Sequence, residues 1–211
     1  MEKDIKKPVV RNKEKSKQRL LAAVGKILKA KGFAALKVND IAAVAGLDKK
    51  LIYNYFGGTD GLIDEYIRSL DFWSNVSEDD GPGDLSDGGQ AFTRNMIQGQ
   101  YDYVAQNKEL QKILLWGITE QRKSLKKIAD EREANGEVLM ANITDPFFGE
   151  QSEEFRAAMA ILISGAYYLN MYTTNAKTFC GIDLTQPKGR DQIKNALGTL
   201  VDLVYERKRK G

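Results

Sequence analysis

The segment "DKKLIYNYF", residues 48–56, gathers polar side chains of the kinds that bind nucleic acids. Two ammonium groups, two phenol hydroxyls and one amide come from Lys49, Lys50, Tyr53, Tyr55 and Asn54. Ammonium and hydroxyl groups bind phosphate oxygens, and a side-chain amide can pair with the edge of an adenine base. The segment therefore favours contact with a nucleic acid over the alternative, which is a solvated turn of an amphipathic helix.

Side chains suited to catalysis or metal binding are scarce. The chain has no histidine, which excludes Ser-His-Asp and Cys-His catalysis and histidine-containing zinc sites. Its one cysteine, Cys180, cannot form an internal disulfide and is expected to be a small buried side chain. A carboxylate enzyme would have to use Asp130, Glu133 and Glu137, on a highly charged face that should be solvated. We therefore predict no enzyme activity, no cofactor and no metal site.

The charge of the chain is unevenly distributed. Residues 1–56 hold 14 Lys/Arg against 5 Asp/Glu, a net charge of +9, and the remainder holds 18 against 24, a net charge of −6. This asymmetry predicts a module that faces a polyanion, joined to a module with another task. The acidic, glycine-rich segment 77–89 is predicted to be a linker, because it lacks the residue order of a calcium-binding loop.

Membrane insertion and secretion are not expected. The most apolar stretch, residues 157–169, is shorter than the ~20 residues of a membrane-spanning helix. The N-terminal segment has charge but no apolar core, so it does not resemble a secretory signal. We expect a cytoplasmic protein.

Hydrophobic residues recur at helical spacing, and no stretch alternates long enough to predict a sheet. We predict an all-α fold of about nine helices. The first should span Ser16–Lys31, and two short helices should follow at 38–45 and 49–56, the second capped by Asp48. Another should begin near Thr59. The later helices are expected at about 92–104, 107–116, 124–143, 152–179 (capped by Ser152) and 190–208.

The two short helices and the glycine between them match a helix-turn-helix, whose second helix enters the major groove of DNA. The small Ala45 and the flexible Gly46 would let the two helices approach each other. The expected core of this motif is Ile41, Ala42, Ala45, Leu47, Ile52 and Phe56.

The run "KVNDIAAVAGLDKKLIYNYFGGTDGLIDEYI" resembles the DNA-binding domain of TetR/AcrR-type transcriptional regulators. The family pattern Val-x-Asp-Ile-Ala, Ala-Gly-Val-Ser and Leu-Tyr-x-Tyr-Phe is followed with its spacing. The resemblance implies a DNA-binding domain over 14–74, with the motif at 37–56, and a helical effector-binding and dimerisation domain over 75–211. It implies a repressor that a small molecule releases from a palindromic operator. The alternative is a helical dimeric interaction or sensor protein with weak or lost DNA binding.

The resemblance also implies a set of DNA contacts. In this sequence Lys37 stands where Ser or Thr is usual, Asn39 replaces Arg, and Leu51 replaces Thr. The usual Pro-Ser-Lys-Glu after the recognition helix is Gly57–Asp60 here, so the phosphate-gripping lysine is missing, and the Thr59 hydroxyl or backbone amides would have to replace it. The predicted DNA contacts are Lys37, Asn39, Lys49, Lys50, Leu51, Tyr53, Asn54, Tyr55 and Thr59.

Two alternatives remain open for this surface. Tyr53 or Tyr55 could pack against Phe33 and Phe56 instead of offering a hydroxyl to phosphate. Basic residues before the motif should lie near the adjoining backbone or minor groove and add affinity with little specificity. They are Arg11, Lys13, Lys15, Lys17 and Arg19.

The second module is expected to bind a ligand and to dimerise. The resemblance implies an effector pocket, and large side chains with polar tips are its expected lining, although most could be ordinary core. The predicted ligand contacts are Met96, Tyr101, Trp116, Tyr167 and Met171. The helix at 152–179 is apolar nearly all round, so we expect a homodimer through it and the helix at 190–208. The alternative is a monomer whose other helices bury both faces.

Overall fold

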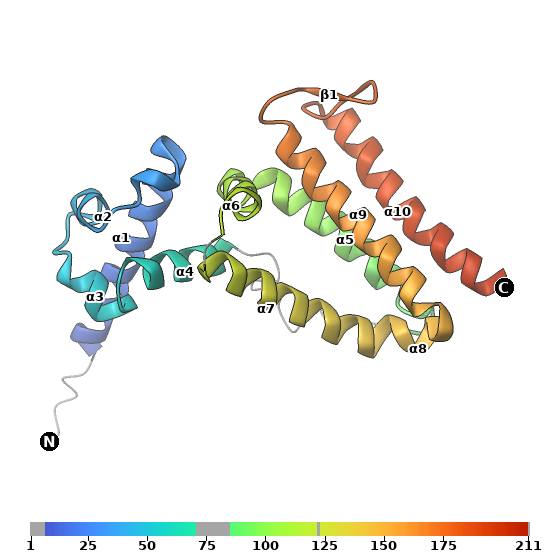
Figure 1. Cartoon of the computed structure of the whole chain (residues 1–211), viewed down its shortest axis with the longest axis horizontal. Helices are drawn as coiled ribbons and strands as arrows, with labels where there is room; N and C mark the ends of the chain where they lie inside the picture. The colour runs from blue at the N-terminus through green and yellow to red at the C-terminus, as the bar shows by residue number, and fades with distance from the viewer. Residues whose placement is uncertain (1–6, 71–84, 122, 211) are drawn as a thin grey trace, which may run out of the picture. The chain divides into compact units, whose positions relative to one another are not determined.

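A computed structural model of the chain describes residues 7–70, 85–121 and 123–210, nearly all of them in helices (Figure 1). The all-α prediction is confirmed. Contacts divide the described residues into two compact units. The first unit contains the described residues up to 70 and the segment Trp116–Ile128. The second unit contains residues 85–115 and the described residues from Ala129 onward.

The first unit is built on four helices around one core. They are α1 (Lys7–Lys31), α2 (Val38–Ala45), α3 (Lys50–Phe56) and α4 (Thr59–Leu70), with a 3-10 turn, η1, at Phe33–Ala35. The residues buried in these helices include Leu20, Val24, Ile27, Leu28, Ile41, Ile52, Leu62 and Ile67. The predicted start of the first helix at Ser16 is wrong, because α1 begins at Lys7. The added turns are rich in Lys, Arg and Glu, which favour helix even without an apolar stripe.

The turn between α2 and α3 forms as the sequence predicts. Gly46 ends α2 in the left-handed region, with φ 62° and ψ 41°. Asp48 then accepts a hydrogen bond from the Lys50 amide at 2.8 Å, so the predicted cap is confirmed. At the next junction Gly61 lets α4 approach α3, because a Cβ there would lie 1.9 Å from the Phe56 carbonyl oxygen.

The last turn of α6 (Lys108–Thr119) belongs to the first unit. Trp116 is buried and stacks on Phe33, with ring centroids 3.4 Å apart. Its indole N–H donates to Glu120 Oε2 at 2.7 Å. The stacking joins residues far apart in sequence, so periodicity could not indicate it.

The second unit packs α5 (Gln90–Gln106) against α9 (Ser152–Tyr172) and α10 (Pro187–Lys210) (Figure 1). The core that they share contains Ile97, Tyr101, Phe148, Phe155, Met159, Ala166, Leu197, Val201 and Tyr205. Asn107 caps α6 by accepting a hydrogen bond from the Leu110 amide at 3.0 Å. Residues 77–84 of the predicted linker at 77–89 lie outside the described residues.

The segment between α9 and α10 differs from the prediction. The helix expected over 152–179 ends at Tyr172, where the Thr173 and Thr174 hydroxyls donate to helix carbonyls and compete with its continuation. A short hairpin follows, β1 (Thr178–Phe179) and β2 (Ile182–Asp183). Its two-residue turn has positive φ at Cys180 and Gly181, the conformation that matches strand twist. The prediction of a buried Cys180 is therefore wrong, because the turn exposes it.

Two other helix starts also differ from the prediction. α10 begins at Pro187, ahead of the expected Arg190, and proline suits a first helical position. Ser152 lies in the first turn of α9, which follows the 3-10 turn η5 (Gly149–Gln151), and it does not cap the helix as expected.

Tyr205 of α10 ties down the start of α5. Its buried hydroxyl donates to the Gly88 carbonyl at 3.1 Å and lies 3.2 Å from Thr93 Oγ1. Burial raises the pKa of Tyr205 to about 12, and the hydrogen bond with Thr93 opposes this rise. Asp87 caps the same helix start by accepting hydrogen bonds from the Gly89 and Ala91 amides, each at 2.8 Å.

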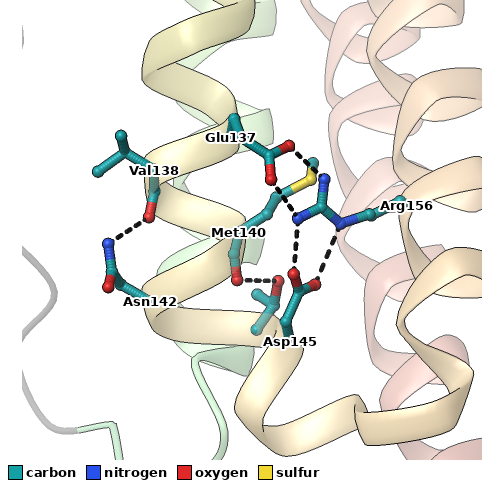
Figure 2. Close-up of polar contacts among 7 residues, drawn as sticks. Glu137, Val138, Met140, Asn142, Asp145 and Arg156 are labelled. Carbon is teal, nitrogen blue, oxygen red and sulfur yellow. Dashed lines mark hydrogen bonds and ion pairs between the residues drawn. The ribbon is translucent and has the colours of Figure 1, made fainter.

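A charged cluster fixes the end of α7 (Lys123–Leu139) against α9. Figure 2 shows the Arg156 guanidinium directed at the carboxylates of Glu137 and Asp145. These acids flank η4 (Met140–Thr144), a π-helical turn that leads into α8 (Asp145–Phe148). The hydrogen bond from Arg156 lowers the pKa of Glu137. The cluster therefore holds both ends of an irregular turn.

Candidate nucleic-acid interface

The recognition helix α3 has one face in the core and one face open. Ile52 is fully buried and anchors the helix. Lys49, Lys50 and Asn54 are exposed, and the Tyr53 residue is 54% exposed. This face presents two ammonium groups, a hydroxyl and an amide, the donors that phosphate and base edges accept.

Tyr55 lies closer to the core than Tyr53. Its ring is half-buried and meets Phe56 edge to face, with centroids 6.4 Å apart. Leu51 is also half-buried. The structure thus separates the two tyrosines that the sequence left equivalent: Tyr53 extends from the surface, whereas Tyr55 packs partly on its neighbour.

The start of α2 lies beside the start of α3. Lys49 Nζ donates to Asn39 Oδ1 at 3.4 Å, so the structure brings these two predicted residues together. Lys37 precedes α2 with an extended backbone and an exposed side chain. Thr59 is half-buried at the first residue of α4. The predicted DNA contacts therefore occupy three successive helix starts and the open face of α3.

Arg19 has a second role that the sequence does not indicate. Its guanidinium Nη2 donates to the carbonyls of Ala45 at 2.7 Å and Gly46 at 3.3 Å. The side chain therefore holds the turn that sets the direction of α3. Its position just before the buried Leu20 gave no sign of this contact, because the partners are carbonyls that sequence patterns do not mark.

The N-terminal part of α1 lies alongside the end of α3. Lys13 Nζ is 5.6 Å from the centroid of the Tyr55 ring, and Lys17 Nζ is 5.8 Å from that of Phe56. Both distances lie within the range of a cation–π interaction. Lys15 is exposed, and the Arg11 side chain lies outside the described residues.

The five predicted ligand contacts divide between the two units. Tyr101 and Met171 are buried in the second unit and Met96 and Tyr167 are half-buried there, whereas Trp116 stacks on Phe33 in the first unit. Burial raises the pKa of Tyr101, and the nearby Arg190 opposes this rise. Their roles as ligand contacts stay predictions.

Gln100 is a further buried polar group, and nothing in its sequence position marks it. It is only 2% exposed, and its Oε1 atom has no hydrogen-bond partner within the described residues. It follows Met96 by four positions and therefore shares a face of α5 with it. A pocket of about 100 Å³ lies elsewhere in the unit and contains none of the five predicted contacts. Its lining is Phe148, Gln151, Glu154, Phe155, Ala158, Val204, Arg207 and Lys208.

Across the ranges that the structure covers, each helix is too short or too polar to cross a lipid bilayer.

Comparisons with known proteins agree with this geometry. Residues 20–66, which include α2 and α3, match the model of a family described as bacterial regulatory proteins, tetR family. The chain is 23% identical over 185 residues to the HTH-type transcriptional repressor NicS of Pseudomonas putida, covering 84% of this chain and 86% of that protein. The crystal structure of a transcriptional regulator from Rhodococcus sp. Rha1 shares the fold, with a TM-score of 0.52 and 15% identity. That match covers 90% of this chain and 96% of the other.

The helix-turn-helix with its open polar face lies inside the matched segment, and the wider matches extend over most of the chain. Residues 20–66 therefore match the tetR family of bacterial regulatory proteins, and the chain is similar over most of its length to a protein named as a transcriptional repressor.

Proposed function

We propose that this chain represses transcription as a cytoplasmic homodimer that binds a palindromic operator and leaves it when a small molecule binds. The observation that carries the proposal is the open face of α3, where Lys49, Lys50, Tyr53 and Asn54 surround a helix anchored by Ile52. The similarity to a protein named as a transcriptional repressor supports repression. Residues 14–74 would form the DNA-binding domain, and 75–211 would bind the effector and dimerise.

Each contact in this scheme has a stated chemistry. Lys49 and Lys50 would reach base edges or flanking phosphates from the first turn of α3, and Asn54 would pair with an adenine edge. Lys37 and the Tyr53 hydroxyl would bind phosphates, and Leu51 would meet a thymine methyl group. Asn39 would act by orienting Lys49, to which it is hydrogen-bonded.

The proposed dimer interface is the exposed apolar surface of α9 and α10. On α9, Ile161 is 73% exposed, and Tyr168 lies two turns further along the same face. On α10, Leu203 is 52% exposed, one turn beyond the exposed Leu200. Large apolar side chains that follow one another on a helix face are costly to leave in water, and a two-fold partner would cover them.

The effector would bind in the second unit. Gln100 Oε1 is buried and has no hydrogen-bond partner among the described residues, which supports a ligand with a hydroxyl or N–H group. An unsatisfied buried acceptor is costly, and a ligand donor would satisfy it. Met96 is half-buried on the same face of α5, which favours a ligand with an apolar part next to its donor group. The released state must bind the effector more tightly than the DNA-bound state does.

Selection from random DNA, followed by binding to the DNA upstream of the chain's own gene, tests the proposal. We expect an approximately palindromic site with half-sites about one helical turn apart or somewhat more. Failure to select any sequence would overturn it and favour the alternative, a helical interaction or sensor protein without DNA binding.

A further inference from the structure

The segment after the recognition helix, Gly57–Asp60, contains no cation, whereas the resemblance to TetR/AcrR-type regulators implies a phosphate-binding lysine there. Gly57 and Gly58 carry no side chain, Thr59 is half-buried and Asp60 is an exposed carboxylate. A phosphate near the C-terminal end of α3 would therefore meet no lysine from the segment that follows it. If the helix-turn-helix binds DNA, a cation from another element must bind this phosphate.

Two lysines of α1 lie at this end of α3. Lys13 Nζ lies 5.6 Å from the centre of the Tyr55 ring, and Lys17 Nζ lies 5.8 Å from that of Phe56. The two lysines are four residues apart and share one face of α1. Within the described residues, no carboxylate forms an ion pair with either of them, so their charge is available to a ligand.

We propose that Lys13 and Lys17, held over the rings of Tyr55 and Phe56, bind the phosphate that the lysine missing from Gly57–Asp60 would otherwise take. This inference rests on the proposed function, DNA binding by α3. It assigns the phosphate contact at the end of α3 to the N-terminal part of α1, whose longer-than-predicted helix carries both lysines.

The rings have a definite physical task in this arrangement. An ammonium group has three N–H donors, and a ring face attracts the cation while leaving donors free for phosphate oxygens. A lysine side chain loses considerable rotamer freedom when it is fixed, so a ring that already orients it lowers the cost of binding. Tyr55 would thus act through its ring and position Lys13, and its hydroxyl would not be needed.

The test compares the salt dependence of operator binding by full-length variants. Affinity is measured by fluorescence anisotropy at several KCl concentrations, with the operator found by selection as the probe. Lys13→Ala/Lys17→Ala should bind more weakly and flatten the slope of log K against log salt by about 0.9 for each phosphate that the protein no longer neutralises. The matched control, Lys26→Ala/Lys31→Ala, removes two exposed charges from α1 and should keep the wild-type slope.

Conservative variants separate charge from packing. Lys13→Arg/Lys17→Arg should restore the slope, because arginine also stacks on rings and binds phosphate. Tyr55→Phe should keep wild-type operator affinity. Tyr55→Ala should lose the share of that affinity that depends on Lys13. If Tyr55→Phe loses as much operator affinity as Tyr55→Ala, the Tyr55 hydroxyl itself contacts DNA. The proposal that the ring positions Lys13 would then be wrong.

The outcomes distinguish this inference from the proposed function. If the wild type binds its operator and the Lys13/Lys17 double alanine variant keeps the wild-type slope, the inference is wrong and the proposed function stands. If the wild type binds no DNA, both are wrong. Loss of binding that the arginine variant does not restore, with unchanged melting temperature, would also overturn the phosphate assignment.

Discussion

Arg156 of α9 binds the carboxylate of Glu137 at the end of α7, with Nη2 3.0 Å from Oε1 and Nη1 bonded to the other oxygen. The same guanidinium donates to Asp145 Oδ2 at 2.6 Å (Figure 2). One side chain therefore bridges the two acids that flank the π-helical turn Met140–Thr144. π-Helical turns disturb the regular backbone ladder, so an external clamp on both sides should stabilise this one.

We predict that Arg156→Met lowers the melting temperature at pH 7 and that this effect becomes smaller in acid. The hydrogen bond from Arg156 holds the pKa of folded Glu137 below its usual value of 4.5. Since the folded pKa is lowered, the stabilisation is fully present above about pH 5 and is lost as pH falls through the folded pKa. Melting curves at pH 7 and pH 3.5 measure this, with Lys188→Met as the control for loss of an exposed cation. If wild type and Arg156→Met differ in melting temperature by the same amount at both pH values, the prediction is wrong.

A second prediction concerns the hydroxyl of Tyr205. Tyr205→Phe keeps the ring but leaves the Gly88 carbonyl and the Thr93 hydroxyl without this partner, so it should cost about 1 to 3 kcal/mol of unfolding free energy. Denaturant unfolding at pH 7 measures the cost. Tyr53→Phe, which changes an exposed tyrosine outside the proposed dimer interface, should change stability by no more than a few tenths of a kcal/mol.

The same hydroxyl predicts an alkaline effect. The pKa of folded Tyr205 is about 12, above the ordinary value of 10.0. A raised folded pKa means that folding favours the neutral phenol, so its contribution is complete below pH 10 and falls as pH rises from 10 through about 12. The gap in stability between wild type and Tyr205→Phe should therefore narrow above pH 10. A gap that stays constant to pH 11.5 would refute this assignment.

A third prediction concerns the turn of the helix-turn-helix. Arg19→Met removes the guanidinium that binds the Ala45 and Gly46 carbonyls, and should lower stability by about 1 kcal/mol because the contact is partly exposed. It should also weaken operator binding, since the turn sets the direction of α3. Lys26→Met, a cation loss elsewhere on α1, should change neither quantity. Unchanged operator affinity in Arg19→Met would show that the turn keeps its geometry without the clamp.

Local features of the fold could be predicted from sequence, and contacts between distant segments could not. Gly46 and Asp48 were identifiable because a left-handed turn and a helix cap depend on residues within the turn itself. Other contacts depend on how helices pack, which periodicity does not specify. They are those of Lys13 with the Tyr55 ring, Arg19 with the Ala45 carbonyl and Trp116 with Phe33. Periodicity also misplaced the end of α9, because threonine hydroxyls that bind helix carbonyls interrupt the helix there.

The recognition face itself gives a fourth prediction. Lys49→Ala/Lys50→Ala should sharply weaken operator binding, because it removes both ammonium groups from the first turn of α3. The slope of log K against log salt should also flatten, by about 0.9 for each phosphate left without its lysine. Gel-shift titration at several salt concentrations measures both effects, with Lys26→Ala/Lys31→Ala as the charge-matched control. Binding equal to that of the wild type would refute the assignment of these lysines to DNA.

The final prediction concerns assembly through α9 and α10. Ile161→Glu or Leu203→Glu places a carboxylate on the exposed apolar surface that the proposed dimer would bury, and an unpaired buried charge is costly. Each variant should therefore dissociate to the 23.6 kDa monomer at micromolar concentration, whereas the wild type should show twice that mass by light scattering. Val138→Glu alters another exposed apolar residue, on α7, and should remain dimeric.

Dissociation should also weaken operator binding. A dimer presents two recognition helices to two half-sites, so a monomer loses the gain in effective concentration that comes from linking them. Ile161→Glu and Leu203→Glu should consequently bind the full palindrome about as weakly as a single half-site, whereas Val138→Glu should keep wild-type affinity. A wild-type chain that is monomeric at micromolar concentration would overturn the dimer. A dimeric Ile161→Glu variant with full affinity would move the interface to another surface.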